Sequence, residues 1–369
     1  MTSVEKKKPG VIPVFVPHQG CPHDCVFCNQ KKITGQTEAF DKNLIEQIIE
    51  AHLETMKEKR YPIEIAFYGG SFTGIDTDIQ IEYLQIARRY LQDGHIHGVR
   101  LSTRPDYIDE DTLIRLAEYG VTTIELGVQS LSESVLVASN RGHTVEDVKR
   151  AVERIKSYDF TLGLQMMIGL PGDTLKRSTD TAREIILLNP DFVRIYPTVV
   201  IKDTELEMLY KQDAYNELNV DEAVIWLSHI MPMFSKANIP IIRVGLQPTD
   251  DLTNGGSRIA GAYHPSMRQL VQSEIILSLL TREIDLVVQN SVNKISENSL
   301  EDSLKISFGV NGKDWTEFRG AKAKNFDKLK NVYQGVQFEF NLDNEVTRKT
   351  INMCIEMNHN IEIRVLKID

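Results

Sequence analysis

The sequence is poor in cysteine, in long apolar runs and in net positive charge. Only four of its 369 residues are cysteines, too few for a disulfide framework, and this favours a reducing compartment. No stretch approaches twenty apolar residues, and the N-terminus MTSVEKKKPG lacks the apolar core of a signal peptide. A net charge of −10 argues against broad, non-specific binding of nucleic acid. These absences predict a cytoplasmic protein that does not engage a membrane.

Three of the four cysteines, Cys21, Cys25 and Cys28, stand within eight residues in the string CPHDCVFC. Three thiolates can bind one metal centre, but they leave one iron of a four-iron cluster without a cysteine, as at open catalytic metal sites. From spacing alone, a zinc site completed by His18 or His23 is the alternative. The fourth cysteine, Cys354, lies in a helix-like apolar stretch and is interpreted as a buried small hydrophobic residue.

The first two thirds of the chain alternate apolar runs with amphipathic stretches. The apolar runs are typical of strands buried on both faces of a parallel sheet, and they lie at residues 11–17, 63–68, 98–103, 123–129, 161–170 and 192–200. Helical periodicity is found at residues 43–58, 78–92, 110–119, 145–157 and 174–188, with Asp41 and Thr144 as plausible N-caps. A further apolar run at 240–247 either adds a strand or begins the segment by which the chain leaves the barrel. Six βα units indicate a partial (β/α)6 TIM-type barrel over residues 1–249.

The remaining third predicts an exit and linker over residues 250–302, followed by a small α+β domain over residues 303–369. Residues 250–266 are rich in Gly, Asp, Ser and Pro and are predicted to form a loop. Residues 268–290 predict a helix followed by a strand. In the last domain, short strands are expected around LKISFG, GVQFEF and IEIRVL, with helices between them.

Part of this small domain resembles the β–α–α–β core of a KH RNA-binding module. Gly320–Ala323 (GAKA) would stand at its GxxG loop, with Ala323 in place of the second glycine. Between Leu304 and Lys330 there are seven Lys or Arg residues against three Asp or Glu residues. The resemblance implies RNA-backbone contacts by Arg319, Gly320, Lys322, Lys324 and Lys328.

Polar residues and glycines follow each predicted strand of the barrel. In a βα barrel, functional groups gather at the carboxyl ends of the strands. The segments at these ends are YGGSFT (68–73), STRPD (102–106), GVQS (127–130), MIGLPG (167–172) and RIYP (194–197). The sequence therefore predicts a ligand site at this edge, beside the cysteines.

The CxxxCxxC string, with Phe27 before its last cysteine, resembles the signature of the radical S-adenosylmethionine superfamily. In that superfamily three thiolates hold a [4Fe-4S] cluster, whose open iron chelates the amino and carboxylate groups of S-adenosylmethionine. The resemblance implies Cys21, Cys25 and Cys28 as cluster ligands. It also implies formation of a 5′-deoxyadenosyl radical, and an electron donor such as ferredoxin or flavodoxin.

By the same resemblance, the strand ends contact S-adenosylmethionine. Gly69 and Gly70 are similar to the glycine pair that binds the methionine amino group, where the absence of a side chain permits close backbone approach. The cofactor contacts that the resemblance implies are Phe27, Gly69, Gly70, Ser71, Thr103, Arg104, Gln129, Ser130, Met167, Ile168 and Gly169. No residue is assigned as a catalytic acid or base.

Five longer strings, STRPD, ELGVQS, NRGHT, MMIGLPGDT and RIYPTVVIKDTEL, resemble the radical domain of the catalytic subunit of Elongator over residues 10–247. This resemblance implies modification of a tRNA base. The remaining residues are too few for an acetyltransferase domain, and no [RQ]-x-x-G-x-[GA] loop is found, so acetyl transfer is not implied. Two alternatives stay open: a coproporphyrinogen-oxidase-like enzyme acting on a small molecule, and a non-catalytic RNA-binding protein with a structural cluster or zinc.

Overall fold

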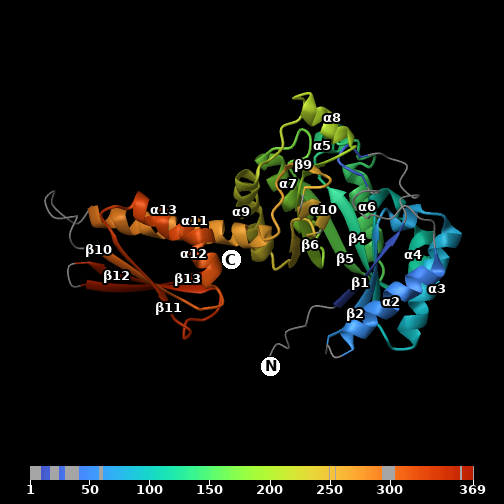
Figure 1. Ribbon diagram of the computed structural model, residues 1–369, viewed down its shortest axis with the longest axis horizontal. Helices are drawn as coiled ribbons and strands as arrows, with labels where there is room; N and C mark the ends of the chain where they lie inside the picture. The colour runs from blue at the N-terminus through green and yellow to red at the C-terminus, as the bar shows by residue number, and fades with distance from the viewer. Residues whose placement is uncertain are drawn as a thin grey trace. The chain divides into compact units, whose positions relative to one another are not determined.

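The computed structural model describes residues 10–16, 25–29, 41–57, 61–248, 250–253, 255–292, 304–357 and 360–368 (Figure 1). The chain divides into two compact units. The first unit comprises residues 1–220 and 237–263, and the second comprises residues 221–236 and 264–369. Each unit has its own sheet and is described by itself.

The first unit is built on a seven-stranded sheet of order β1-β2-β3-β4-β5-β6-β8, in which all neighbours are parallel. Its strands are β1 (Gly10–Val16), β2 (Ile63–Gly69), β3 (Gly98–Thr103), β4 (Val121–Gln129), β5 (Thr161–Ile168), β6 (Phe192–Pro197) and β8 (Ile241–Val244). Strand order follows chain order, as expected for successive βα units. The predicted partial barrel is confirmed, and the run at 240–247 supplies its seventh strand.

Helices connect the parallel strands and cover the sheet: α2 (Lys42–Met56), α3 (Thr77–Gln92), α4 (Glu110–Glu118), α6 (Val145–Lys156) and α7 (Leu175–Leu187). Two shorter helices, α5 (Glu133–Ala138) and α8 (Glu205–Lys211), follow β4 and β6 in the chain. Short 3-10 turns η1 (Phe72–Gly74) and η2 (Pro105–Tyr107) follow β2 and β3. Both predicted N-caps are confirmed. Asp41 accepts hydrogen bonds from the first backbone N–H groups of α2, and Thr144 forms a capping box with Asp147.

The predicted strand at 192–200 is divided in the structure. β6 ends before Thr198, whose backbone N–H and Oγ1 both donate to the carbonyl oxygen of Ile168, at 2.9 and 2.8 Å. The chain continues as β7 (Val199–Ile201), which leaves the barrel sheet. A continuous apolar run therefore serves two different sheets, a break that periodicity alone does not reveal.

The expectation of a loop over residues 250–266 is wrong in part. The segment contains a short helix, α10 (Asp250–Thr253), and a strand, β9 (Arg258–Gly261), which pairs antiparallel with β7. Gly261 has a φ of 97°, and a Cβ atom there would lie 2.8 Å from the carbonyl oxygen of Thr198. Glycine is required at this crossing because the two backbones approach so closely.

The second unit is a four-stranded sheet of order β11-β10-β12-β13, with helices on one face. Its elements are α9 (Val220–Lys236), α11 (Met267–Val292), β10 (Leu304–Val310), α12 (Trp315–Arg319), η3 (Ala321–Ala323), α13 (Lys324–Val332), β11 (Gln337–Leu342), β12 (Thr350–Met357) and β13 (Asn360–Lys367). β10 and β11 are parallel, and the other pairs are antiparallel. The separate small α+β domain is confirmed, and residues 293–303, at the end of the predicted exit and linker, lie outside the described residues.

Two local predictions for this unit are wrong. Residues 268–290 form the single helix α11, because Leu280, Ile284 and Val287 are buried at helical spacing and this periodicity outweighs the β-branched residues near its end. The stretch around Cys354 is not helix-like. It is the strand β12, in which buried and partly buried residues alternate, and Cys354 is partly buried.

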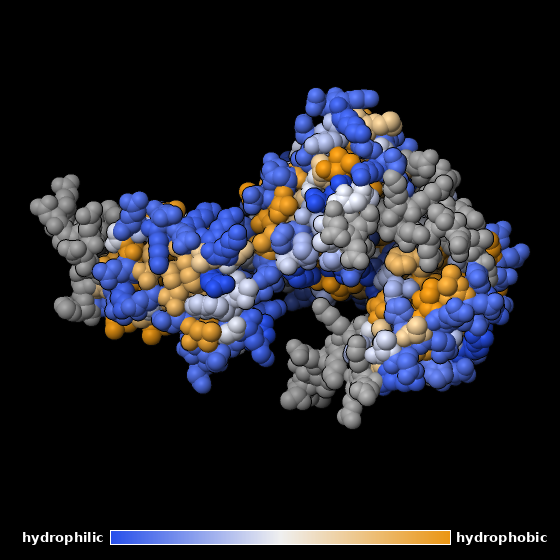
Figure 2. All heavy atoms as spheres, viewed as in Figure 1, coloured by the Kyte–Doolittle hydropathy of each residue, from blue (hydrophilic) through white to orange (hydrophobic). Residues whose placement is uncertain are grey.

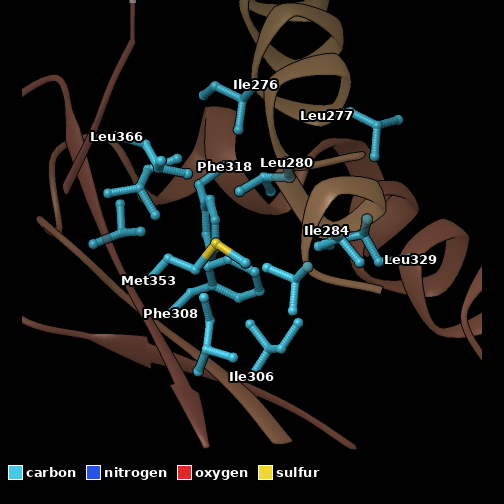
Figure 3. Packing of buried hydrophobic residues seen from close by; sticks show 14 of the residues in the cluster. Ile276, Leu277, Leu280, Ile284, Ile306, Phe308, Phe318, Leu329, Met353 and Leu366 are labelled. Carbon is cyan, nitrogen blue, oxygen red and sulfur yellow. The ribbon is translucent and has the colours of Figure 1, made fainter. Parts of the chain in front are cut away.

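Aromatic and aliphatic side chains pack between the sheet and α11 in the second unit (Figure 3). Phe308 and Met353 come from the sheet, Leu280 and Ile284 from α11, and Phe318 from α12, and all five are fully buried. Other aromatic rings enclose Phe308, and Phe326 stacks on Phe340 with a centroid distance of 3.8 Å. This core orients α12 and α13 and therefore the turn between them.

The turn between α12 and α13 contains three residues with positive φ: Gly320 at 75°, Lys322 at 51° and Ala323 at 64°. A Cβ atom on Gly320 would lie 2.9 Å from Oδ1 of Asn325, whose amide group donates to Ser273 and to the carbonyl oxygen of Phe318. The GAKA segment is thus a tight left-handed connection, and Ala323 adopts a conformation that glycine adopts more readily.

Replacing Ala323 by glycine is expected to stabilise the second unit by about 0.5–1 kcal/mol. The left-handed conformation costs alanine roughly 1–2 kcal/mol, and the greater freedom of glycine in the unfolded chain offsets about half of that gain. Urea unfolding of the two proteins measures the difference. Ala321→Gly is the control, because Ala321 has no positive φ, and it should lower stability. Equal effects of the two substitutions would contradict the assigned conformation.

Candidate metal and cofactor site

Cys25 and Cys28 lie in a turn that is fixed to two other segments of the first unit. The backbone N–H of Cys28 donates to the carbonyl oxygen of Cys25 at 2.9 Å. Val26 between them donates to the carbonyl oxygen of Ser139 and accepts from the N–H of Leu206, at 3.2 and 2.7 Å. Cys25 is buried and Cys28 is partly buried. The turn is therefore held by the end of α5 and the start of α8.

Side chains beside the two cysteines anchor the same turn. Val26 is buried with Val200, Leu206 and Tyr215, and Phe27 packs partly buried against this cluster. Asn29 donates its side-chain amide to the carbonyl oxygen of Lys202 at 3.1 Å. Phe27, predicted as a cofactor contact, thus has a packing role in the structure.

Cys21, His18 and His23 lie outside the described residues. Among the side chains that the structure describes, no group of three His, Cys, Asp or Glu residues is arranged to hold a metal ion. The described turn offers two sulfur ligands, and the set of three expected from the sequence includes Cys21.

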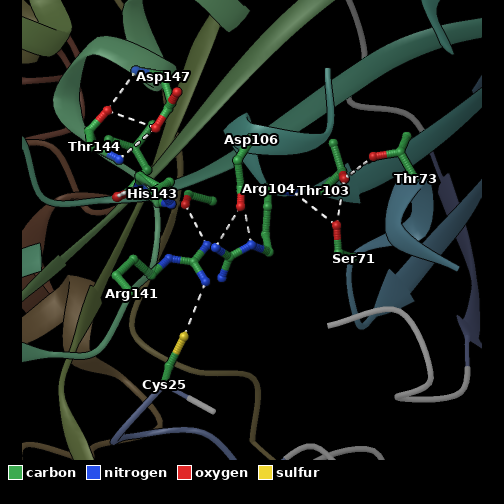
Figure 4. Close-up of polar contacts among 12 residues, drawn as sticks. Cys25, Ser71, Thr73, Thr103, Arg104, Asp106, Arg141, His143, Thr144 and Asp147 are labelled. Carbon is green, nitrogen blue, oxygen red and sulfur yellow. Dashed lines mark hydrogen bonds and ion pairs between the residues drawn. The ribbon is translucent and has the colours of Figure 1, made fainter. Parts of the chain in front are cut away.

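A buried arginine contacts the sulfur of Cys25. Nη1 of Arg141 lies 3.3 Å from Sγ of Cys25, and Nη2 donates to the carbonyl oxygen of Gly127 at 2.7 Å, at the carboxyl end of β4 (Figure 4). A Cβ atom on Gly127 would lie 2.9 Å from Nη2. A guanidinium donor suits a sulfur that carries negative charge, as a metal-bound thiolate does. The fit between the turn and a metal centre rests on this contact.

The sequence prediction missed Arg141, although the residue belongs to the string NRGHT that was noted for its resemblance. Its neighbour Asn140 has a φ of 48°, and Gly142 has a φ of 80°. A signal was available, since NRG between two helices indicates a tight turn. Which way the arginine pointed depended on the tertiary fold.

The carboxyl ends of β2 and β3 bring three hydroxyl groups together (Figure 4). Thr103 Oγ1 lies 2.8 Å from Oγ of Ser71 and 2.5 Å from Oγ1 of Thr73. The N–H of Arg104 donates to Ser71 Oγ at 3.2 Å, and its guanidinium binds both carboxylate oxygens of Asp106 at 2.9 Å. Ser71, Thr103 and Arg104 of the predicted set are therefore contiguous, and Asp106 holds the charged group of Arg104.

Left-handed backbone marks three of the strand ends. The φ angles are 108° at Gly69, 65° at Gln129 and 75° at Gly169. Gln129 is the unusual case, because it is not glycine and because its strand slips by one residue against β5 between Gly127 and Gln129. Such strained positions concentrate at ligand sites. Gly70 follows Gly69 directly and belongs to the same strand end.

The remaining predicted contacts lie at the ends of β4 and β5. Ser130 is buried, and its Oγ accepts from the N–H of Ser132 at 3.1 Å, so its hydroxyl caps the following turn. Met167 is partly buried and Ile168 is fully buried. The carbonyl oxygen of Gly169 accepts from the hydroxyl of Tyr215 at 2.6 Å. These strand ends are held by the fold, and Met167 keeps an exposed part.

His143 is a buried histidine with one unsatisfied ring nitrogen. Its Nε2 lies 3.2 Å from the carbonyl oxygen of Val128. Because a carbonyl only accepts, Nε2 carries the proton and Nδ1 carries the lone pair. Nδ1 has no hydrogen-bond partner within the part of the chain that the structure describes. Burial, with the positive charges of Arg141 and Arg104, lowers the pKa of His143 to about 3. The ring is therefore neutral near pH 7 and offers an acceptor to a ligand.

Acidification is expected to destabilise the first unit through His143. Between pH 6.5 and pH 3 the unfolded chain binds a proton that the folded chain does not, so stability falls as the pH is lowered through this range. At pH 5 the loss is roughly 2 kcal/mol. Urea unfolding at pH 7 and pH 5 measures it. His143→Gln keeps a donor for Val128 and does not titrate, so the variant should lose less stability; equal losses would contradict the assignment.

A buried network of ion pairs joins neighbouring strands of the sheet, the same strands whose carboxyl ends form the site. Glu125 of β4 accepts from Arg100 at 2.9 Å, pairs with Arg194 at 2.5 Å and accepts from the hydroxyl of Tyr68 at 3.2 Å. Glu64 binds the other side of Arg100 at 2.6 Å. Burial and the carboxylate of Glu125 raise the pKa of Tyr68. The sequence prediction missed this network, although charged residues within strands that are otherwise apolar were a signal.

Two family models match the chain. The first, described as the Radical SAM superfamily, matches residues 15–185, and the second, described as the Radical_SAM C-terminal domain, matches residues 190–276. Together they cover the sheet from β2 onward, the end of β1, the cysteine turn and every described strand end of the site. No helix among the described residues is both long and apolar enough to cross a membrane.

Relatives with similar sequences include two proteins of Methanocaldococcus jannaschii. An uncharacterised protein is 31% identical over 242 residues, which are 62% of this chain and 74% of that protein. A tRNA uridine(34) acetyltransferase is 27% identical over 270 residues, 62% of this chain and 50% of that enzyme. The Elongator complex protein 3 of Saccharomyces cerevisiae is 34% identical over 166 residues, 44% of this chain and 29% of that protein. The chain thus spans about half of the acetyltransferase that it matches.

A solved structure has the same fold. The archaeal Elp3 of Methanocaldococcus infernus, solved without its first 46 residues, superposes with a TM-score of 0.57 at 23% identity. The match covers 72% of this chain and 62% of that structure. At this identity the likeness supports the fold and no more.

Proposed function

We propose that this chain, which belongs to the radical S-adenosylmethionine superfamily, modifies a nucleoside of tRNA by radical chemistry. The cofactors of the superfamily are a [4Fe-4S] cluster and S-adenosylmethionine. The observation that carries the proposal is the turn of Cys25 and Cys28, held against the carboxyl end of β4 with Arg141 donating to a sulfur. The names of the relatives, tRNA uridine(34) acetyltransferase among them, supply the substrate class.

Three cysteines are assigned to the cluster. Cys21, Cys25 and Cys28 would hold three of its irons and leave the fourth open. When bound, these cofactors would supply radical chemistry through reductive cleavage of S-adenosylmethionine. The electron comes from a donor such as ferredoxin or flavodoxin. Arg141 balances the charge of the cysteine sulfur by its hydrogen bond to Cys25.

The side chains at the strand ends bind and orient S-adenosylmethionine in this proposal. The left-handed backbone at Gly69 opens the β2 edge to close approach, and Ser71 and Thr103 offer hydroxyl groups beside it. Nδ1 of His143 is a buried acceptor that a hydroxyl or amino group of a ligand would satisfy. Met167, which keeps an exposed part, supplies apolar surface for the adenine, whereas the side chain of Ile168 is fully buried beneath it in the sheet.

The second unit contacts the RNA backbone in this proposal. Arg319, Lys322, Lys324 and Lys328 are exposed around the left-handed GAKA turn. Their charges attract phosphates, whereas Gly320 is buried beside Asn325 and Ser273 and is not accessible to an RNA backbone. Lys324 also forms an ion pair with Asp221 at 3.6 Å, but both side chains are exposed, and such a pair is too weak to prevent Lys324 from contacting a phosphate.

Charge reversal at Lys322 and Lys328 together is expected to weaken tRNA binding by at least about tenfold at low salt. Each lost phosphate contact reduces the number of counterions that are released when tRNA binds, and this release favours binding. Titration of labelled tRNA at several salt concentrations measures the affinity and its salt slope. Lys313→Glu, a change at an exposed lysine outside the turn, is the control. An unchanged salt slope in the double variant would contradict the RNA contact.

Activity of the reconstituted protein tests the proposal. The full chain is loaded with iron and sulfide under anaerobic conditions. It is then incubated with a reductant, S-adenosylmethionine and tRNA isolated from cells that lack this protein. The expected product is 5′-deoxyadenosine, formed faster with tRNA than without it. Bound zinc in place of iron, and no 5′-deoxyadenosine, would instead identify a structural metal site and overturn the enzyme assignment.

A further inference from the structure

β13 forms an open edge of the second unit's sheet. It pairs with β12 and, within the residues that the structure describes, with no other strand. Ile361, Ile363 and Val365 point away from the helices and are 67%, 68% and 62% exposed. Figure 2 shows apolar surface, in orange, on the part of the chain that carries these strands. Exposed edges of this kind recruit another strand unless charge or proline blocks them.

The hydrogen-bond pattern shows which residues of β13 face the open edge. Ile368 lies opposite Lys349, and its N–H donates to the carbonyl oxygen of Lys349 at 2.9 Å. In an antiparallel pair, bonded and non-bonded residue pairs alternate. Glu362 and Arg364 therefore bond to β12. The odd-numbered residues, the apolar Ile361, Ile363 and Val365 among them, direct their N–H and C=O groups outward.

The segment Ile361–Val365 (IEIRV) is complementary to itself. With two copies antiparallel and a two-fold axis at Ile363, that residue lies opposite its own counterpart, and Ile361 lies opposite Val365. These are the pairs whose backbone groups face outward, so they can form the new ladder. The same register places Glu362 of one copy opposite Arg364 of the other, twice, in the non-bonded pairs where side chains come closest.

The neighbouring two-fold registers are unfavourable. An axis at Glu362 places two glutamates opposite each other, and an axis at Arg364 does the same with two arginines, and like charges directly opposite destabilise a strand pair. Only the axis at Ile363 combines apolar partners, opposite charges and matched backbone groups. In the single chain, Arg364 already contacts Glu362 at 2.7 Å and Glu283 of α11 at 3.4 Å, so its guanidinium is held near the edge.

We propose that two copies of this chain associate through β13, across a two-fold axis at Ile363, and form one continuous eight-stranded sheet. An isologous contact of this kind closes on itself and leaves no further edge of the same type. A strand of eight residues makes a contact smaller than the roughly 1,600 Å² of a standard interface, so the dimer should dissociate on dilution.

Sedimentation velocity of the full chain, over roughly 1 to 200 µM, tests the proposal because a contact of this size dissociates in an accessible range. A monomer–dimer equilibrium is expected. Ile363→Lys places two like charges on the axis and should raise the dissociation constant at least about tenfold. Leu342→Lys, at an exposed apolar residue of the opposite edge strand β11, is the matched control and should leave it unchanged. A monomer at every concentration, or a dimer lost in the control instead, would overturn the proposal.

Charge exchange provides a second test of the register. Glu362→Arg alone, or Arg364→Glu alone, places like charges across the axis and should weaken the dimer. The double variant restores opposite pairs and should recover at least part of the affinity. Circular dichroism verifies that each variant is folded. A double variant that associates no better than either single variant would exclude this register, and with it the two-fold pairing at Ile363.

Discussion

Replacement of Cys28 by alanine is expected to abolish formation of 5′-deoxyadenosine, with a loss of at least about a hundredfold, because the proposed cluster would keep only two of its three thiolates. The side chain is partly buried, and the turn is held by backbone bonds of Val26 that the substitution leaves in place. The barrel should therefore remain folded. Iron content and 5′-deoxyadenosine are measured after anaerobic reconstitution, and circular dichroism verifies the fold.

The chain supplies its own control for this experiment. Cys354 is a partly buried cysteine of β12 in the second unit, and Cys354→Ala should retain iron and activity. Cys25→Ala should behave like Cys28→Ala and also leave Arg141 without its sulfur partner. If Cys28→Ala formed 5′-deoxyadenosine at the rate of the unsubstituted chain, the assigned cysteine ligands would be wrong.

Replacement of Glu125 by alanine is expected to destabilise the first unit by about 3–5 kcal/mol, because it leaves buried positive charge without its partner. Arg100 would keep Glu64, whereas Arg194 would lose its carboxylate. The side chain of Glu125 is 4% exposed, so water does not replace it. The loss is comparable with the whole stability of a marginal domain.

Hydrogen exchange of peptides from β3, β4 and β6 measures this destabilisation where it arises. Faster exchange is expected throughout the sheet. Asp180→Ala is the control, since it removes a carboxylate that pairs with Lys176 and Arg183 on the exposed face of α7, and such surface pairs contribute little. Exchange in Glu125→Ala as slow as in the control would contradict a structural role for the network.

The barrel could be predicted from the sequence because its strands are buried on both faces and its helices are amphipathic. These two periodicities located six strands of the sheet, and the capping residue types Asp41 and Thr144 located both tested N-caps. Periodicity failed where an apolar run changed partners. The division at Thr198 depends on a hydrogen bond to Ile168, thirty residues earlier in the chain. β12 was missed because Met353, Cys354 and Ile355 form a continuous apolar run, which hides the alternation of buried and partly buried residues.

The site could be predicted in part for a different reason. The carboxyl ends of parallel strands meet at one edge of a sheet, so the sequence alone predicts that Ser71, Thr103 and Arg104 lie close together. Arg141 could not, because it lies in a turn after α5 and reaches Cys25 across 116 residues of sequence. The lone pair of His143 also depended on the fold, since only the contact with Val128 defines which ring nitrogen is protonated.

The nucleosides of tRNA test the central claim most directly. Total tRNA from cells with and without this protein is digested and compared by liquid chromatography and mass spectrometry. The account predicts that one modified nucleoside disappears with the protein and that its precursor accumulates. The Cys28→Ala protein should fail to restore it, and the Cys354→Ala protein should succeed. Identical nucleoside profiles in the two cell lines would contradict the claim that this radical enzyme acts on tRNA.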